Sequence, residues 1–153
     1  MASRPIWVSI ALSASILCPS GFAAEPPGRA EAGAVQVTVD GIATQAGLVR
    51  VGLFRGAAAF DDNAVSVGET VTAEADSVTV TFSDLEPGRY GIKLYHDVNG
   101  DGEMNTNLFG LPAEPFAFSN NAMGRFGPPQ FAAAGFDIAA GATALQVISL
   151  RQP

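Results

Sequence analysis

Four short segments alternate apolar and polar residues with a period of two, and this pattern limits the fold more than any other feature. The segments are VQVTV at 35–39, LVRVGL at 48–53, SVTVTF at 77–82 and YGIKLY at 90–95. Successive side chains of a β-strand point to opposite faces of a sheet, so each segment predicts a strand with one buried face. The side chains expected in the core are Val37, Val51, Val80, Ile92 and Leu94.

Weaker strand patterns at 65–74, 131–138 and 143–150 bring the expected total to seven strands. In the last pattern Val147 and Ile148 are both apolar but point opposite ways, so its buried face stays open. The sequence therefore predicts an all-β fold, a seven-stranded antiparallel β-sandwich. One long connection, at 96–130, shows neither the strand period nor the helical period. Its four phenylalanines indicate an ordered loop rather than a disordered linker.

The first 23 residues have the organisation of a secretory signal peptide. An apolar run at 6–17 follows a short basic start and is too short to span a bilayer. In the stretch GFA at 21–23, Gly21 and Ala23 are small residues at the two positions that a signal peptidase reads, which predicts cleavage after residue 23. Residues 24–33 then predict a flexible linker, and 34–151 a single domain. The predicted location is therefore periplasmic or extracellular.

The chain is acidic, with 15 acidic and 8 basic residues and a formal net charge of −7. This balance argues against binding to nucleic acid and to anionic membrane surfaces. No further stretch is apolar and long enough to predict a membrane span. The one cysteine, Cys18, lies in the predicted signal peptide, so the exported domain is expected to be held by its core or by a bound ion.

The stretch DVNGDGEMN at 97–105 contains most of a calcium-binding loop. Calcium prefers oxygen ligands, and the pattern D-x-N-x-D-G spaces them two residues apart before a sharp turn. The bidentate glutamate that normally closes such a loop is missing, because Leu108 stands at its position. The expected ligands are Asp97, Asn99, Asp101, Glu103 through its carbonyl, Asn105, and Glu114 as the replacement carboxylate. Two interpretations stay open: a calcium site, or an Asx-turn in which these side chains satisfy their own backbone.

Other residues of the 96–130 connection have alternative roles. Phe109, Phe116 and Phe118 either cover one end of the sandwich or line a pocket for an apolar ligand. Arg125 either pairs with a carboxylate such as Glu114 or binds an acidic ligand. His96 is the only histidine.

His96 is either packed in the fold or functional, and no nucleophile with a placed partner accompanies it. No enzyme is predicted for that reason.

The segment YHDVNGDGEMNTNLFGLPAEPFAFSNNAMGRFGPPQF, at 95–131, resembles the signature of an exported bacterial family of uncharacterised proteins, domain-of-unknown-function family 2141. The shared motifs are His-Asp followed by the Asn/Asp/Gly loop, then Phe-Gly-x-Pro, Phe-Ser-Asn-Asn-Ala-x-Gly and Gly-Pro-Pro-x-Phe. The resemblance implies an Ig-like or prealbumin-like sandwich and carries no activity. It marks 96–131 as the distinctive element, and with it Asn120 and Asn121 become candidate ligand-binding residues.

These observations predict an exported, non-catalytic β-sandwich module that is stabilised by calcium. A carrier of a small apolar ligand that uses the phenylalanine-rich loop is the alternative, and an enzyme is a third possibility. The expected partner is a protein or a small molecule whose identity the sequence does not specify.

Overall fold

The structure is a computed structural model and describes residues 30–153. The predicted signal peptide and most of the predicted linker lie outside the described residues. In chain order the elements are β1 (Gly33–Asp40), β2 (Leu48–Arg55), α1 (Gly56–Asp61), β3 (Val67–Thr72), β4 (Ser77–Leu85), β5 (Gly88–Asp97), β6 (Phe116–Phe118), η1 (Ser119–Asn121), α2 (Phe131–Ala134), β7 (Phe136–Ile138) and β8 (Thr143–Ser149).

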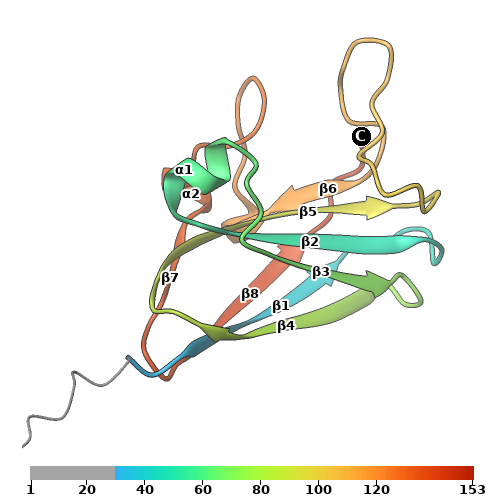
Figure 1. The fold of residues 1–153 in the computed structure, drawn as a ribbon. Coiled ribbons are helices and arrows are strands. Elements are labelled where there is room, and N and C mark those ends of the chain that lie inside the picture. The colour runs from blue at the N-terminus through green and yellow to red at the C-terminus, as the bar shows by residue number, and fades with distance from the viewer. Residues whose placement is uncertain (1–29) are drawn as a thin grey trace, which may run out of the picture.

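Two sheets form a sandwich-like, all-β arrangement (Figure 1). The smaller sheet has the strand order β4-β1-β8, and the larger has β3-β2-β5-β6 with β7 paired to the start of β5. The prediction of seven strands was wrong, because β6 has only three residues and is too short to show a period of two. The prediction of a purely antiparallel fold was also wrong, since β1 and β8 pair in parallel.

The period-two pattern correctly predicted the core between the sheets. Val35, Val37 and Val39 of β1 are fully buried, and so are the inward side chains of β2 and β5. All five predicted core residues are buried: Val37, Val51, Val80, Ile92 and Leu94. In β8 the open question is resolved, because Ile148 is buried whereas Val147 is 59% exposed.

A second apolar cluster lies on the outer face of the larger sheet, where α1 and α2 cover it. Phe54, Phe60 and Ala134 form its buried part, and Phe118 and Phe131 pack against it. The strand expected over 131–138 forms only in its second half. Three consecutive alanines, residues 132–134, favour the helix α2 in the first half.

The predicted long loop at 96–130 is instead a composite of ordered pieces. It contains the end of β5, the strand β6 and the turn η1. Two further segments project from the same side of the molecule: the hairpin loop (residues 105–113), between β5 and β6, and the Gly-Pro loop (residues 122–130), between η1 and α2 (Figure 1). No helix within residues 30–153 has the length and apolar character needed to cross a membrane.

Candidate functional site

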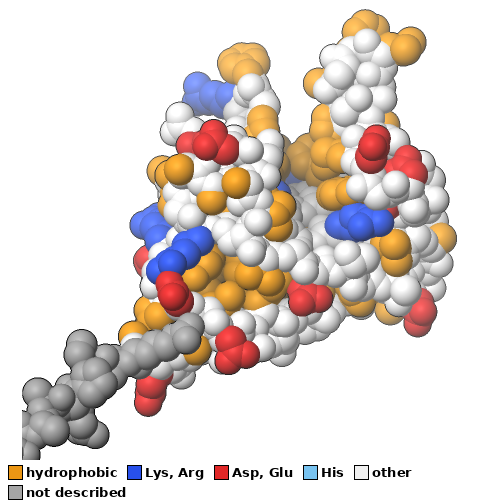
Figure 2. Space-filling view, in the orientation of Figure 1, with side chains coloured by type: hydrophobic (Ala, Val, Ile, Leu, Met, Phe, Trp, Pro, Cys, Tyr) orange, Lys and Arg blue, Asp and Glu red, His pale blue; other side chains and the backbone are white. Residues whose placement is uncertain are grey.

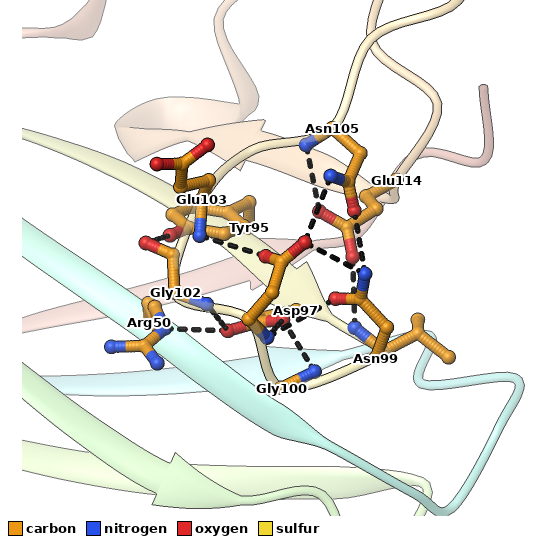
Figure 3. A network of polar contacts seen from close by, with 11 residues as sticks. Arg50, Tyr95, Asp97, Asn99, Gly100, Gly102, Glu103, Asn105 and Glu114 are labelled. Carbon is orange, nitrogen blue, oxygen red and sulfur yellow. Dashed lines mark hydrogen bonds and ion pairs between the residues drawn. The ribbon is translucent and has the colours of Figure 1, made fainter.

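Asp97 ends β5 and organises the loop that follows it (Figure 3). Its carboxylate is fully buried, and its Oδ1 accepts hydrogen bonds from the backbone N–H groups of Gly100 and Asp101 at 2.7 and 3.1 Å. Its Oδ2 accepts the N–H of Gly102 at 2.9 Å and Nε of Arg50 at 2.8 Å. Gly102 has a φ of 87°, which confirms that the motif glycine makes the sharp turn. Four donors therefore satisfy this one carboxylate.

Arg50 reaches Asp97 from the neighbouring strand β2. Burial raises the pKa of Asp97, but the hydrogen bonds from Arg50, Gly102 and Gly100 outweigh it and hold that pKa below its ordinary value. The hydrogen bond to Asp97 raises the pKa of Arg50 in turn. The pair is therefore charged at neutral pH.

The remaining acidic and amide side chains of the motif gather on the other side of the loop. Asp101 accepts the backbone N–H of Glu103 with Oδ1, at 2.9 Å, and the amide groups of Asn99 and Asn105 with Oδ2, at 2.8 and 3.0 Å. These hydrogen bonds lower the pKa of Asp101, with the bond from Glu103 as the largest cause. Glu103 takes part in this network only through its backbone.

Glu114 clamps the two ends of the loop together. Its Oε1 accepts the N–H of Val98 at 3.0 Å and its Oε2 accepts the N–H of Asn105 at 3.1 Å. The sequence thus correctly placed Glu114 against the loop. It pairs with backbone donors, however, and not with Arg125, so the expected Arg125–Glu114 pair was wrong. We call these six residues the polar base: Arg50, Asp97, Asn99, Asp101, Asn105 and Glu114.

The polar base has the contacts of an Asx-turn network. The carboxylate oxygens of Asp97, Asp101 and Glu114 all have protein donors. Within residues 30–153 no three His, Cys, Asp or Glu side chains gather in a way that could hold a metal ion. A cation at the loop would thus depend on Asp101 with amide and carbonyl oxygens, which is a weak ligand set for calcium.

The hairpin loop rises directly from the polar base. Backbone bonds tie its two arms together, from Asn107 N–H to Leu111 O at 2.8 Å and from Ala113 N–H to Asn105 O at 2.8 Å. At its tip, Oδ1 of Asn107 accepts the N–H groups of Phe109 and Leu111 at 2.9 and 3.1 Å. The tip is therefore an ordered turn that presents Leu108, which is fully exposed, and Phe109, which is 88% exposed.

The Gly-Pro loop forms the second projection. A Cβ at Gly124 would lie 2.0 Å from the carbonyl oxygen of Gly127, so only glycine allows this close approach of the two arms. Phe126 at the tip is fully exposed, and Met123 is 58% exposed. Figure 2 shows hydrophobic side chains at the ends of both projections, with the surface hollowed between them.

Two phenylalanines predicted to share a pocket with Phe109 have another role. Phe116 and Phe118 of β6 contact each other, with ring centroids 5.9 Å apart. The ring of Phe118 also packs against Phe60 in the second apolar cluster, on the outer face of the larger sheet, which we call the outer cluster. Nζ of Lys93 lies 4.3 Å from the centroid of the Phe60 ring, and burial lowers the pKa of Lys93. Phe109 lies apart at the hairpin tip, so the three phenylalanines do not line a common cavity.

His96 is a packed residue of β5. It is 1% exposed, its Nε2 donates to the carbonyl oxygen of Ala46 at 2.6 Å, and its Nδ1 has no hydrogen-bond partner among the described residues.

The side chains of η1, which is the Ser-Asn-Asn segment, fasten it to the neighbouring elements. Ser119 accepts the N–H of Ile92 and donates to the carbonyl oxygen of Ala134. Asn120 donates to the carbonyl oxygens of residues 133 and 135. Asn121 donates to Val147 O and accepts Ser149 N–H. The predicted ligand-binding amides thus make structural contacts.

A family of bacterial proteins, described as "Uncharacterized protein conserved in bacteria (DUF2141)", matches residues 37–146 of the chain. The chain belongs to this family. The resemblance drawn from the motifs at 95–131 is thereby confirmed, and the matched region includes the polar base and both projecting loops. No curated protein and no solved structure matches the chain.

Sequence reasoning missed Arg50 and Asn107, and it treated Leu108 only as an absent ligand. Arg50 carried a weak signal, as a charge in the middle of a strand pattern. Asn107 and Gly110 flank Leu108 and Phe109, and Asn and Gly at that spacing favour a turn. The pairing of Arg50 with Asp97 depends on the register between β2 and β5, in which Arg50 lies opposite Tyr95.

Proposed function

We propose that this protein is a non-catalytic binding module that engages its partner with the apolar tips, namely Leu108, Phe109 and Leu111 of the hairpin loop and Met123 and Phe126 of the Gly-Pro loop. The observation that carries the proposal is their exposure. Leu108, Phe126 and Phe109 are the three most exposed large hydrophobic side chains of the described residues. Single exposed hydrophobic residues are ordinary on protein surfaces, but several gathered on two neighbouring projections mark an interaction site.

The energetics support binding at these tips. Each large apolar side chain that becomes buried in a complex contributes roughly 1.5–3 kcal/mol. The hairpin loop is already ordered by its own hydrogen bonds, so little conformational entropy remains to be lost when a partner binds.

The chemistry around the tips favours binding over catalysis. Arg125 is the only charged residue on either projecting loop, and an arginine is a poor acid or base at neutral pH. The single histidine is enclosed in the fold, away from the exposed tips. A general acid, a general base and a nucleophile are therefore not gathered at this end of the described structure.

Site-specific photo-crosslinking in the producing cells tests the proposal. A photoreactive amino acid replaces Phe109 or Phe126, and as a matched control Leu145, which is 71% exposed on β8 of the other sheet. We expect positions 109 and 126 to form the same adduct and position 145 to form none. The binding proposal is wrong if neither tip forms an adduct, or if all three positions react alike.

Calcium stabilisation is the second candidate function. Nδ2 of Asn99 lies 2.8 Å from Oδ2 of Asp101 and 3.0 Å from Oδ1 of Asn105, so an amide N–H group stands among oxygens that are also ligands for calcium. Rotation of the side-chain amides of Asn99 and Asn105 by half a turn would point their oxygens toward Asp101. A cation could then replace the hydrogen bonds among these three side chains.

A thermal melt with calcium or chelator tests this candidate. At a tenfold excess over Kd, calcium adds about 1.4 kcal/mol to the free energy of unfolding, which raises Tm by several degrees. Asp101→Asn is the matched variant, because it keeps the shape of the side chain and one acceptor oxygen while it removes the charge. We expect it to abolish the calcium shift, and equal wild-type melting in calcium and chelator would exclude the site.

Export and the finer fold assignment complete the proposal. The signal-peptide pattern supports secretion to the periplasm or beyond, and the family resemblance supports an Ig-like or prealbumin-like sandwich. N-terminal sequencing of the secreted protein is expected to begin at residue 24 or 25, and a mature protein that retains Met1 would contradict export by cleavage.

A further inference from the structure

We infer that the partner of the apolar tips is the interface of a zwitterionic lipid bilayer, into which both projecting loops insert their tips. This inference rests on the proposed binding function and names the chemistry of the partner. Three independent features of the loops carry it: the satisfied backbone of the hairpin tip, the charge distribution, and the arrangement of the two tips.

The hydrogen bonds of the hairpin tip reduce the free-energy cost of moving its backbone out of water. Polar backbone groups without partners are costly in an apolar medium, where no water replaces them. Asn107 accepts the N–H groups of Phe109 and Leu111, and the N–H groups of Asn107 and Gly110 are bonded to carbonyl oxygens of the same turn. Pro112 of the same loop has no backbone N–H to satisfy. Leu108 and Phe109 can thus enter an apolar phase with few unpaired donors.

The charges of the domain are segregated away from the tips. The chain has 15 acidic residues, yet between Met104 and Gln130 the only acidic one is Glu114, which is buried and bonded to backbone. The one cation there, Arg125, is exposed beside Phe126 and makes no ion pair with another described residue. A guanidinium beside an inserted phenylalanine lies at the depth of lipid phosphate groups, with which it forms paired hydrogen bonds.

The acidic residues below the tips select the kind of lipid. Asp101 and Glu103 are exposed at the foot of the hairpin loop, where Figure 2 shows acidic side chains below the apolar end. They would be repelled by an anionic surface, whereas a zwitterionic one leaves the apolar contribution unopposed.

The arrangement of the tips fits a bilayer better than a protein groove. Figure 1 shows the two loops projecting from the same side with their ends apart, and Figure 2 shows no continuous apolar surface joining those ends. A protein partner or a second copy would need two pockets at the matching separation. A lipid interface accepts both tips at any spacing, provided that they point the same way.

Single-tryptophan fluorescence tests the inference on the full chain. The chain has one tryptophan, Trp7, outside the described residues, so Trp7→Phe gives a background without tryptophan. Three proteins are compared in that background: Phe109→Trp, Phe126→Trp and the control Leu145→Trp. Each is mixed with phosphatidylcholine vesicles, with and without brominated acyl chains that quench a tryptophan in contact with them. The control reveals any binding by the N-terminal apolar segment, which all three proteins share.

We expect both tip tryptophans to shift their emission to the blue and to lose at least half of their intensity to brominated lipid. The tryptophan at 145 is expected to change by less than a tenth. An unresponsive tryptophan at either tip, or an equal response at 145, would overturn the lipid assignment. Adducts to a protein or to a second copy at 109 and 126, together with unresponsive tryptophans, would overturn it and leave the binding function standing. The absence of any adduct would remove both.

Discussion

The polar base and the apolar tips are neighbours along the chain and opposite in physical character. In the polar base, Asp97 alone accepts four hydrogen bonds and is fully buried. Eleven residues later, the side chains of Leu108 and Phe109 are almost completely exposed. The same segment thus contains a buried carboxylate with four hydrogen-bond donors and two apolar side chains that are left in solvent.

This difference separates what stabilises the fold from what is available to a partner. Removing a buried, fully bonded carboxylate leaves several donors unpaired, which is costly. Removing an exposed side chain leaves the folded state nearly unchanged. Stability and binding are therefore expected to respond to different substitutions within one loop.

Within the polar base and the apolar tips, the largest effect is expected from Asp97→Ala. It leaves the guanidinium of Arg50 and the N–H groups of Gly100, Asp101 and Gly102 without their acceptor. We expect Tm to fall by roughly 10 °C. Asp97→Asn, which keeps one acceptor oxygen, is expected to lower Tm by about half as much. A melt of Asp97→Ala within 2 °C or so of wild type would show that the polar base is not a stabilising element.

The second-largest effect is expected from acid, which should reduce the contribution of the polar base to stability. The pKa of Asp97 is lower in the folded protein than its ordinary value of 3.8, so folding favours the ionised carboxylate. Its contribution to stability is complete above that ordinary value and is lost as pH falls through the folded pKa. Between about pH 4 and pH 2 the Tm of wild type should therefore fall more steeply than that of Asp97→Asn. Parallel acid slopes for the two proteins would contradict this assignment.

How far the sequence predicts the molecule differs between these regions. The alternating valines of β1 and β2 correctly predicted the core, because burial of one strand face leaves a direct period-two pattern. The motif spacing placed Asn99, Asp101 and Asn105 in one side-chain network, whereas Asp97 bonds to Arg50 and to the loop backbone. The short strand β6 and the parallel pairing of β8 were missed, since both depend on contacts between distant segments.

The roles of individual side chains were harder to predict than their positions. Asn120 and Asn121 were expected to bind a ligand, but they fasten η1 to α2 and β8, with a positive φ at each. Exposure of Leu108 could not be inferred either, because an apolar residue in a loop is as often buried under the loop as left on its surface.

Asn107 connects the two regions, and its replacement should have a moderate, local effect. Asn107→Ala removes the acceptor for the N–H groups of Phe109 and Leu111. We expect amide hydrogen exchange at these two residues to accelerate by about tenfold, the equivalent of one lost hydrogen bond of about 1.4 kcal/mol. Exchange in β5 should stay unchanged. Faster exchange throughout the larger sheet would mean that the hairpin loop is part of the cooperative core instead.

The smallest effect on stability is expected at the tips. Phe109→Ser and Phe126→Ser, alone or together, should change Tm by no more than about 2 °C, because neither side chain is packed. Phe60→Ser is the matched control, since Phe60 is buried in the outer cluster, and it should lower Tm by roughly 10 °C or more. A large loss of Tm at either tip would mean that it packs against the protein.

The central claim, that the apolar tips form the binding surface, is tested most directly by one crosslinking comparison. A photoreactive residue at Leu111, which lies in the hairpin loop and is 60% exposed, reports contact with the partner without replacing Phe109 or Phe126. Its adduct yield in producing cells is measured in the wild-type background and in the Phe109→Ser/Phe126→Ser background. We predict that the adduct forms in the first and is reduced at least tenfold in the second, while Tm stays the same. An equal yield in both backgrounds would contradict the claim, since binding would then not depend on the apolar tips.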